Sequence, residues 1–99
     1  MAKKSKKVSR KRDKLFRRRT NVPHKQVEED GMLLDLETGN YFEVNGVGLF
    51  VWECLHRDRS AQEIATKVAA EFDTSNARAL ADTNSFLKLL SKYGLLESI

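Results

Sequence analysis

Short apolar and alternating segments fill the stretch between residues 25 and 44, a pattern typical of β-strands. Three strands are predicted, at residues 25–28, 32–36 and 41–44. In the last of them Phe42 and Val44 share one face, because side chains alternate along a strand. Gly39 and Asn40, in the turn before it, both tolerate positive φ. The second and third strands are therefore expected to form a hairpin.

After Val44 the apolar spacing changes from strand-like to helical. Asn45 is a good N-cap for a first helix, and Ser60 with Glu63 forms a capping-box sequence at the start of a second. Gly94 suits the position that follows the last turn of a third helix. The predicted helices span residues 47–55, 61–72 and 76–93. Strands followed by helices, in the order β-β-β-α-α-α, indicate an α+β fold.

The third predicted helix carries more apolar surface than one core contact requires. The strand 41–44 precedes a helix, so one of its edges is expected to be free and to offer unpaired backbone groups. Two interpretations stay open: the extra apolar surface packs on the first helix, or the edge and the helix together accept an extended peptide as an added strand. The helix residues concerned are Ala79, Thr83, Phe86, Leu90 and Tyr93 on one stripe, Leu80 and Leu87 on the next, and Leu89 further round.

Charge divides the chain into two parts. Residues 1–19 hold eleven Lys or Arg and one Asp, whereas the other 80 residues hold seven basic and thirteen acidic side chains. So few large apolar residues occur before residue 20 that residues 1–20 are expected to be a disordered basic arm, followed by a folded domain over residues 21–99. The acidic body argues against a nucleic-acid footprint on that domain.

The composition also bounds location and chemistry. No apolar run is long enough for a bilayer, and the basic N-terminus lacks the apolar segment of a secretory signal. Cys54 is the only cysteine, so a reducing, cytoplasmic location is expected. His24 and His56 are isolated, and Cys54 is expected to be a packed thiol rather than a nucleophile. Asp35 and Glu37 are expected to face water. No catalytic residue, metal site or cofactor is predicted.

An ordered set of short segments, none of them specific alone, resembles the PqqD family over roughly residues 27–97. The resemblance implies a winged-helix-like fold with a three-stranded antiparallel sheet and three helices. It also implies a peptide chaperone, or recognition element, for ribosomally synthesised and modified peptides. The matching segments are Asp30–Asp35, Gly39–Asn45, Gly48, Val51–Glu53, Arg59–Ala65, Ala81-Asp82, Phe86-Leu87 and Tyr93–Leu96.

In the family the leader of the precursor peptide adds as a strand to the third strand, beside the third helix. The partners so implied are a precursor leader peptide and a modifying enzyme such as a radical SAM enzyme, a cyclase or a protease, with no membrane. Phe42 and Val44 have a second interpretation as core, and Asp82 as a local cap or ion pair. The peptide-binding residues implied for this chain are Tyr41, Phe42, Glu43, Val44, Ala79, Asp82, Thr83, Phe86 and Leu90.

The basic arm is longer and more basic than in typical members, so pyrroloquinoline quinone biosynthesis and another peptide pathway both stay open. The arm either steers an acidic leader, docks on an enzyme or nucleic acid, or is a solvated tail. The alternative function is a winged-helix nucleic-acid-binding protein that uses this arm. Against it, the third helix carries only Arg78, Lys88 and Lys92 as basic residues.

Overall fold

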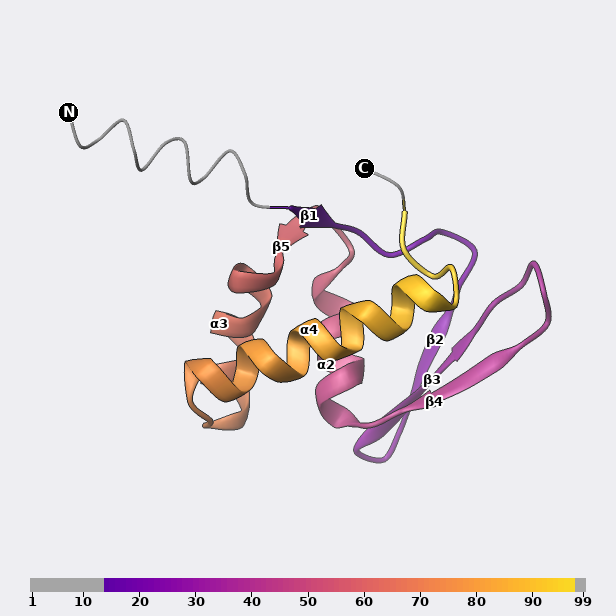
Figure 1. Cartoon of the computed structure of the whole chain (residues 1–99). Helices are drawn as coiled ribbons and strands as arrows, with labels where there is room; N and C mark the ends of the chain where they lie inside the picture. Colours follow the sequence, from indigo (N-terminus) through magenta and orange to yellow (C-terminus); the bar gives the residue numbers. More distant parts are fainter. Residues whose placement is uncertain (1–13, 98–99) are drawn as a thin grey trace.

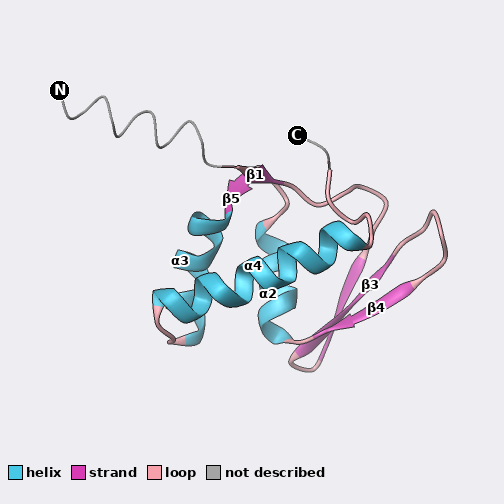
Figure 2. Ribbon diagram, in the orientation of Figure 1, coloured by secondary structure: helices cyan, strands magenta, loops and turns pink. Residues whose placement is uncertain are grey.

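The computed structural model describes residues 14–97, which form an α+β domain (Figure 1). A three-stranded antiparallel sheet in the order β2-β3-β4 lies on one side, and the helices gather on the other (Figure 2). A second, two-stranded sheet joins β1 to β5. The elements are β1 (Leu15–Phe16), β2 (His24–Val27), β3 (Asp30–Leu34), β4 (Tyr41–Val44), α2 (Gly46–Cys54), β5 (Arg59–Ser60), α3 (Ala61–Phe72) and α4 (Asn76–Lys92).

The core lies where the inner face of the sheet meets the three helices. Leu33 is opposite Phe42 in the β3–β4 register and is fully buried. Gly31 allows β3 to pack directly against α2, because a Cβ atom at this position would lie only 2.7 Å from Leu49 Cδ1. The largest buried side chain, Trp52, projects from α2. These contacts bury the apolar side of each helix against the sheet or against another helix.

The helix ends confirm the predicted caps. The Asn45 side chain accepts a hydrogen bond from the Gly48 N–H at the start of α2. Ser60 and Glu63 form the complete capping box of α3. Gly94, at φ +68°, follows the C-cap of α4. Local sequence signals therefore fix where these helices begin and end, and the α+β, winged-helix-like prediction is confirmed.

The strand boundaries differ slightly from the prediction. β3 begins at Asp30, two residues early, because the turn before it consists of Glu28 and Glu29, with Glu28 at φ +59°. Gly31 is a strand residue rather than a turn residue, since its missing Cβ makes room for α2. Gly39, at φ +81°, occupies the hairpin turn before β4 as expected.

The chain before residue 21 differs more. The expected disordered arm does not extend to residue 20: Leu15 and Phe16 pair with Ser60 and Arg59 as β1. Arg17 forms an ion pair with Asp58 at 2.7 Å, so this part of the basic segment is bound to the domain through partners far away in the sequence. Residues 1–13, which hold the rest of the predicted arm, lie outside the described residues. Within residues 14–97 no helix is long and apolar enough to span a membrane.

The capping box allows a stability test. Replacing Ser60 with alanine removes the acceptor of the Glu63 N–H at 3.1 Å and should lower the free energy of unfolding by about 1 kcal/mol. Ser91→Ala is the matched control, because Ser91 is an exposed residue inside α4. Urea unfolding followed by far-UV circular dichroism measures both. Equal stability of Ser60→Ala and the unmutated protein contradicts the assigned role of the cap.

Candidate functional site

The outer edge of β4 is free within the described part of the chain. β3 is the only strand paired with β4 there. The Asp35 N–H donates to the Asn40 carbonyl at 2.8 Å, which fixes the alternation of hydrogen-bonded pairs along the hairpin. Hydrogen-bonded and non-hydrogen-bonded pairs alternate from there, and Tyr41 and Glu43 belong to non-hydrogen-bonded pairs. Their backbone N–H and C=O groups therefore point away from β3. They are therefore available to another extended chain.

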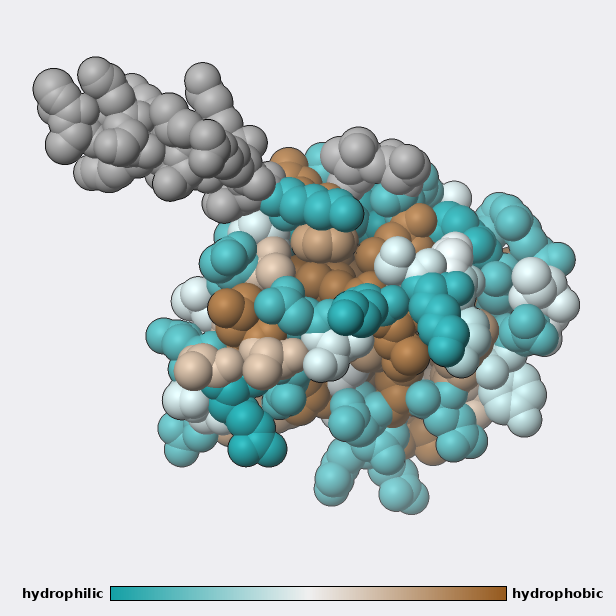
Figure 3. Space-filling view, viewed as in Figure 1, coloured by the Kyte–Doolittle hydropathy of each residue, from teal (hydrophilic) through white to brown (hydrophobic). Residues whose placement is uncertain are grey.

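A groove of about 350 Å³ lies between this edge of β4 and α4. One wall is the strand, and the other is the last two turns of the helix with the chain that follows it. In the space-filling view, apolar surface follows α4 and alternates with polar side chains along the helix (Figure 3). The lining residues are Leu33, Tyr41, Phe42, Glu43, Val44, Phe86, Leu89, Leu90, Tyr93 and Leu95.

A second hollow of about 410 Å³ continues the groove toward the start of α2. Phe86 and Leu89 line both hollows, so the two form one surface along α4. This end is more polar, because Asn45 lines it and Asp82 lies 3.7 Å from Arg78. The combined surface offers an apolar section beside the free strand and a polar section beside the helix N-terminus.

The rings of Phe42 and Tyr93 close the end of the groove nearest the β3–β4 turn. Their centroids are 5.1 Å apart and their planes are inclined by 48°. Phe42 comes from the strand wall, whereas Tyr93 is the C-cap of the helix wall. The contact of these two rings therefore depends on how the end of α4 is held against the hairpin.

The structure brings most of the expected site residues together. Six of them line the first hollow, and Asp82 lines the second, where it also has the expected local partner Arg78. Phe42 and Val44 are half-buried, so each packs on the core and also borders the groove. The six are Tyr41, Phe42, Glu43, Val44, Phe86 and Leu90.

Two expected site residues are placed elsewhere. Ala79 and Thr83 are completely buried and line neither hollow, so they belong to the core and we remove them from the candidate site. In their place the helix presents Leu89 and Tyr93, which are 47% and 48% exposed. Leu89 lay furthest from the predicted stripe, and its apolar character on a polar face was the only sequence signal for it.

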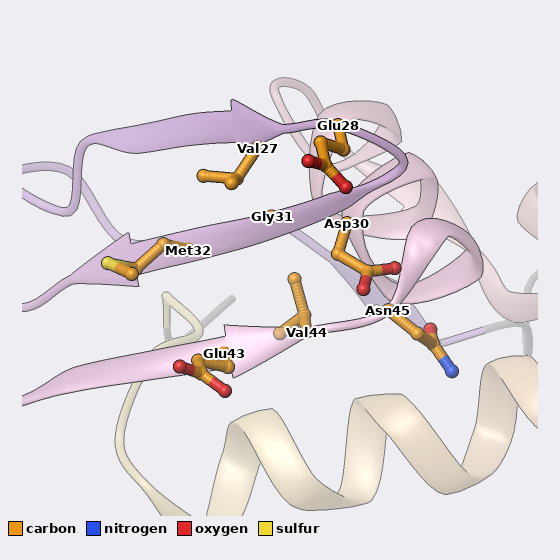
Figure 4. Close-up of a pocket in the computed structure, with 8 residues that line it drawn as sticks. All are labelled: Val27, Glu28, Asp30, Gly31, Met32, Glu43, Val44 and Asn45. Carbon is orange, nitrogen blue, oxygen red and sulfur yellow. The ribbon is translucent and has the colours of Figure 1, made fainter.

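A further hollow, of about 470 Å³, lies on the outer face of the sheet (Figure 4). Val27 and Met32 form part of its wall, and three carboxylates surround it, those of Glu28, Asp30 and Glu43. It covers the β3–β4 pair, whose facing backbone groups already bond to each other. This hollow therefore lacks the free strand edge that the groove beside α4 provides.

Cys54 is buried, and burial raises the pKa of its thiol, which disfavours the thiolate that a nucleophile requires. Its packed position confirms the prediction. Among residues 14–97 no group of three or more His, Cys, Asp or Glu side chains is placed to hold a metal ion.

Asp35 is a correction to the sequence prediction. It was expected to face water, but only 2% of it is exposed. Its Oδ1 atom accepts a hydrogen bond from the Glu37 N–H at 2.9 Å and lies 2.5 Å from Arg19 Nη2. Arg19 is 16 positions away in the sequence, in the segment predicted to be disordered, so no local pattern indicated this partner.

Comparison with solved structures gives three similar folds. TbiB1 in complex with the TbiA(beta) leader peptide is 28% identical, with a TM-score of 0.72, over 84% of this chain and 96% of that one. A lasso peptide synthetase B1 complexed with the leader peptide is 22% identical, with a TM-score of 0.69, over 84% and 98% of the two chains. The PqqD part of Methylobacterium extorquens PqqCD, solved by solution NMR, is 21% identical, with a TM-score of 0.71, over 85% and 89%.

Comparison at the level of sequence gives one family. No curated protein matches the chain significantly. A family model described as "Coenzyme PQQ synthesis protein D (PqqD)" matches residues 30–96. This range begins with β3 and includes β4, all three helices and both walls of the groove. The chain therefore belongs to the PqqD family.

Proposed function

We propose that this chain is a non-catalytic adaptor that binds the leader of a ribosomally synthesised precursor peptide and presents it to a modifying enzyme. The observation that carries the proposal is the free edge of β4 beside the apolar groove of α4. An extended peptide paired with Tyr41 and Glu43 gains backbone hydrogen bonds there. Alternate side chains of that peptide then enter the groove, which provides selectivity.

The similar structures support the binding of a leader peptide. TbiB1 and the lasso peptide synthetase B1 are both described in complex with leader peptides, and the PqqD part of PqqCD is described as a stand-alone recognition element for modified peptides. The partner enzyme that we propose is one that modifies a peptide, with a radical SAM enzyme, a cyclase and a protease as the candidate classes.

Nucleic-acid binding by the folded domain is not favoured. Recognition helices of winged-helix proteins usually carry several basic residues on their exposed face. On α4 one of the three basic residues, Arg78, is paired with Asp82, and the other two are Lys88 and Lys92 near the opposite end. The groove-facing side of α4 is apolar instead, with Phe86, Leu89 and Tyr93.

The test is a titration followed by NMR. The ¹⁵N-labelled protein is mixed with synthetic leaders of the precursor peptides encoded beside its gene, with the TbiA(beta) leader as a reference probe. We expect saturable amide shifts concentrated in β4 and in residues 86–95. Shifts absent from both segments with every leader, or concentrated on the outer face of the sheet, contradict the proposal.

A matched pair of surface substitutions tests the groove itself. Leu89→Glu places a charge in the apolar section of the groove and should weaken leader binding about tenfold, because the carboxylate loses water when the peptide binds. Leu36→Glu makes the same change at a residue that is 58% exposed and outside the groove. Isothermal titration calorimetry with a leader that binds the unmutated protein gives both affinities. Equal weakening by the two variants contradicts a specific role of the groove.

A further inference from the structure

Arg19 bonds to residues beside both walls of the groove, near the end closed by Phe42 and Tyr93. Its Nη2 atom is 2.5 Å from Asp35 Oδ1, and its Nη1 atom donates to the Gly94 carbonyl at 2.5 Å. Its backbone N–H donates to the Leu95 carbonyl at 2.9 Å. One side chain from the N-terminal segment thus bonds to both the hairpin and the end of α4.

Each acceptor is held firmly on its own side. Asp35 follows β3 directly, and its backbone pairs with Asn40 just before β4. Gly94 follows the C-cap residue Tyr93, whose N–H donates to the Leu89 carbonyl. A shift at either acceptor therefore moves a groove wall, because each is one or two residues from a wall residue.

The neighbouring arginines do not make such a connection. Arg17 pairs with Asp58, in the loop between α2 and β5. The Arg18 side chain donates to the Trp52 carbonyl at 3.1 Å and lies over the Trp52 ring, while its backbone forms a bridge with Leu96. Among the side chains of residues 17–19, that of Arg19 is the one that bonds both to the hairpin, at Asp35, and to the end of α4, at Gly94.

We propose that Arg19 is a positioning residue that sets the width of the peptide groove at its Phe42–Tyr93 end. Arg19 and the described residues around it are then a working part of the recognition unit rather than a tail. The inference rests on the proposed function only for its effect on peptide affinity. Its effect on the contact between the Phe42 and Tyr93 rings does not depend on that function, because this contact is present without a peptide.

The chemistry of the side chain fits this role. A guanidinium is planar and presents N–H groups in a fixed fork, so it serves two acceptors in a defined geometry, whereas an ammonium acts as a flexible point charge. Arg19→Lys therefore keeps the attraction to Asp35 and loses the fixed connection to Gly94. Burial alone raises the pKa of Asp35, but the hydrogen bond from Glu37 and the charge of Arg19 outweigh it and lower that pKa. The Asp35 carboxylate is thus ionised at neutral pH.

The experiment compares Arg19→Lys with Arg17→Lys in the full chain. Without peptide, we expect Arg19→Lys to weaken the nuclear Overhauser contact between the Phe42 and Tyr93 rings and to shift the amides of β4. Arg17→Lys, in the same segment, should leave both unchanged. With a leader that binds the unmutated protein, the dissociation constant should rise about tenfold for Arg19→Lys and stay constant for Arg17→Lys.

The outcomes separate the two proposals. If no leader binds the unmutated protein, the proposed function fails, and the ring contact still decides the role of Arg19. An Arg19→Lys variant with unchanged ring contact, β4 shifts and affinity overturns the inference. If Arg19→Lys does not fold, Asp35→Asn takes its place, since it keeps an acceptor oxygen and removes the charge. The same ring contact and affinity are then measured, with the same two outcomes.

Discussion

Replacing Trp52 with alanine is expected to lower the free energy of unfolding by about 3–5 kcal/mol, the largest stability loss that we predict for a single side chain. Trp52 is completely buried and is the largest fully buried residue of the core. A domain of this size is typically stable by about 5–15 kcal/mol, so the loss takes a large share of the total. The chain contains one Trp, so urea unfolding is followed by circular dichroism rather than by fluorescence.

A conservative variant shows whether volume or polarity matters at this position. The indole Nε1 atom is buried without a hydrogen-bond partner among the described residues. Trp52→Phe therefore removes volume but breaks no hydrogen bond, and should cost less than half of the alanine loss. Leu36→Ala, at an exposed position, should stay within about 0.5 kcal/mol of the unmutated protein. Similar losses for Trp52→Phe and Trp52→Ala contradict a cavity as the cause.

The parts of the fold that follow from neighbours in sequence could be predicted. Asn45 and Ser60 bond to groups three residues away, so their capping roles are readable from the local pattern. Gly39 and Gly94 take positive φ where turn and helix-end signals place them. The strand order follows from a hairpin and a two-residue turn, which leave little freedom in the pairing.

The parts of the fold that depend on partners far away in the sequence could not be predicted. Arg19 and Asp35 form a pair across 16 positions, and Arg17 and Asp58 across 41. A run of basic residues looks like a solvated arm when its acidic partners are unknown. Asp35 and Asp58 belong to the net-acidic body. Ion pairs with them, together with backbone hydrogen bonds to Leu55 and Leu95, attach residues 17–19 to the domain.

The elements that form the candidate site could be predicted, and so could most of the residues that line it, but not which side of α4 faces the groove. The resemblance indicated a strand edge beside the last helix, and the structure has this arrangement. Which side of α4 faces the core depends on how the helix is rotated when it packs on α2 and α3. That rotation buries Ala79 and Thr83 and turns Leu89 toward the groove. A stripe drawn through the sequence locates the apolar side only to within one neighbouring row of residues.

The largest effect on binding is expected from Glu43→Pro. The Glu43 N–H points away from β3, so proline there removes a donor that the β3–β4 pair does not use, and an edge strand tolerates this residue. A bound peptide then loses one backbone hydrogen bond and leaves a carbonyl unpaired. We expect a loss of about 2 kcal/mol, which is about thirtyfold in affinity.

The opposite edge of the sheet offers the matched control. In the β2–β3 register Gln26 is opposite Gly31, and the Leu34 N–H bonds to the Pro23 carbonyl. The same alternation therefore points the Gln26 N–H outward, at the edge of the sheet opposite the groove beside α4. Gln26→Pro should bind the leader as the unmutated protein does, with amide spectra showing that both proline variants keep the fold.

A third variant separates the contribution of the Glu43 backbone N–H to peptide binding from that of the Glu43 carboxylate. Glu43→Ala removes the same carboxylate as Glu43→Pro but retains the N–H, so most of the weakening should appear only with proline. If alanine weakens binding as much as proline does, the carboxylate rather than the strand edge recognises the peptide. If Gln26→Pro weakens binding as much as Glu43→Pro does, the loss is not specific to the β4 edge, and strand addition there is contradicted. Strand addition at β4 requires a loss that is specific both to this edge and to the backbone donor.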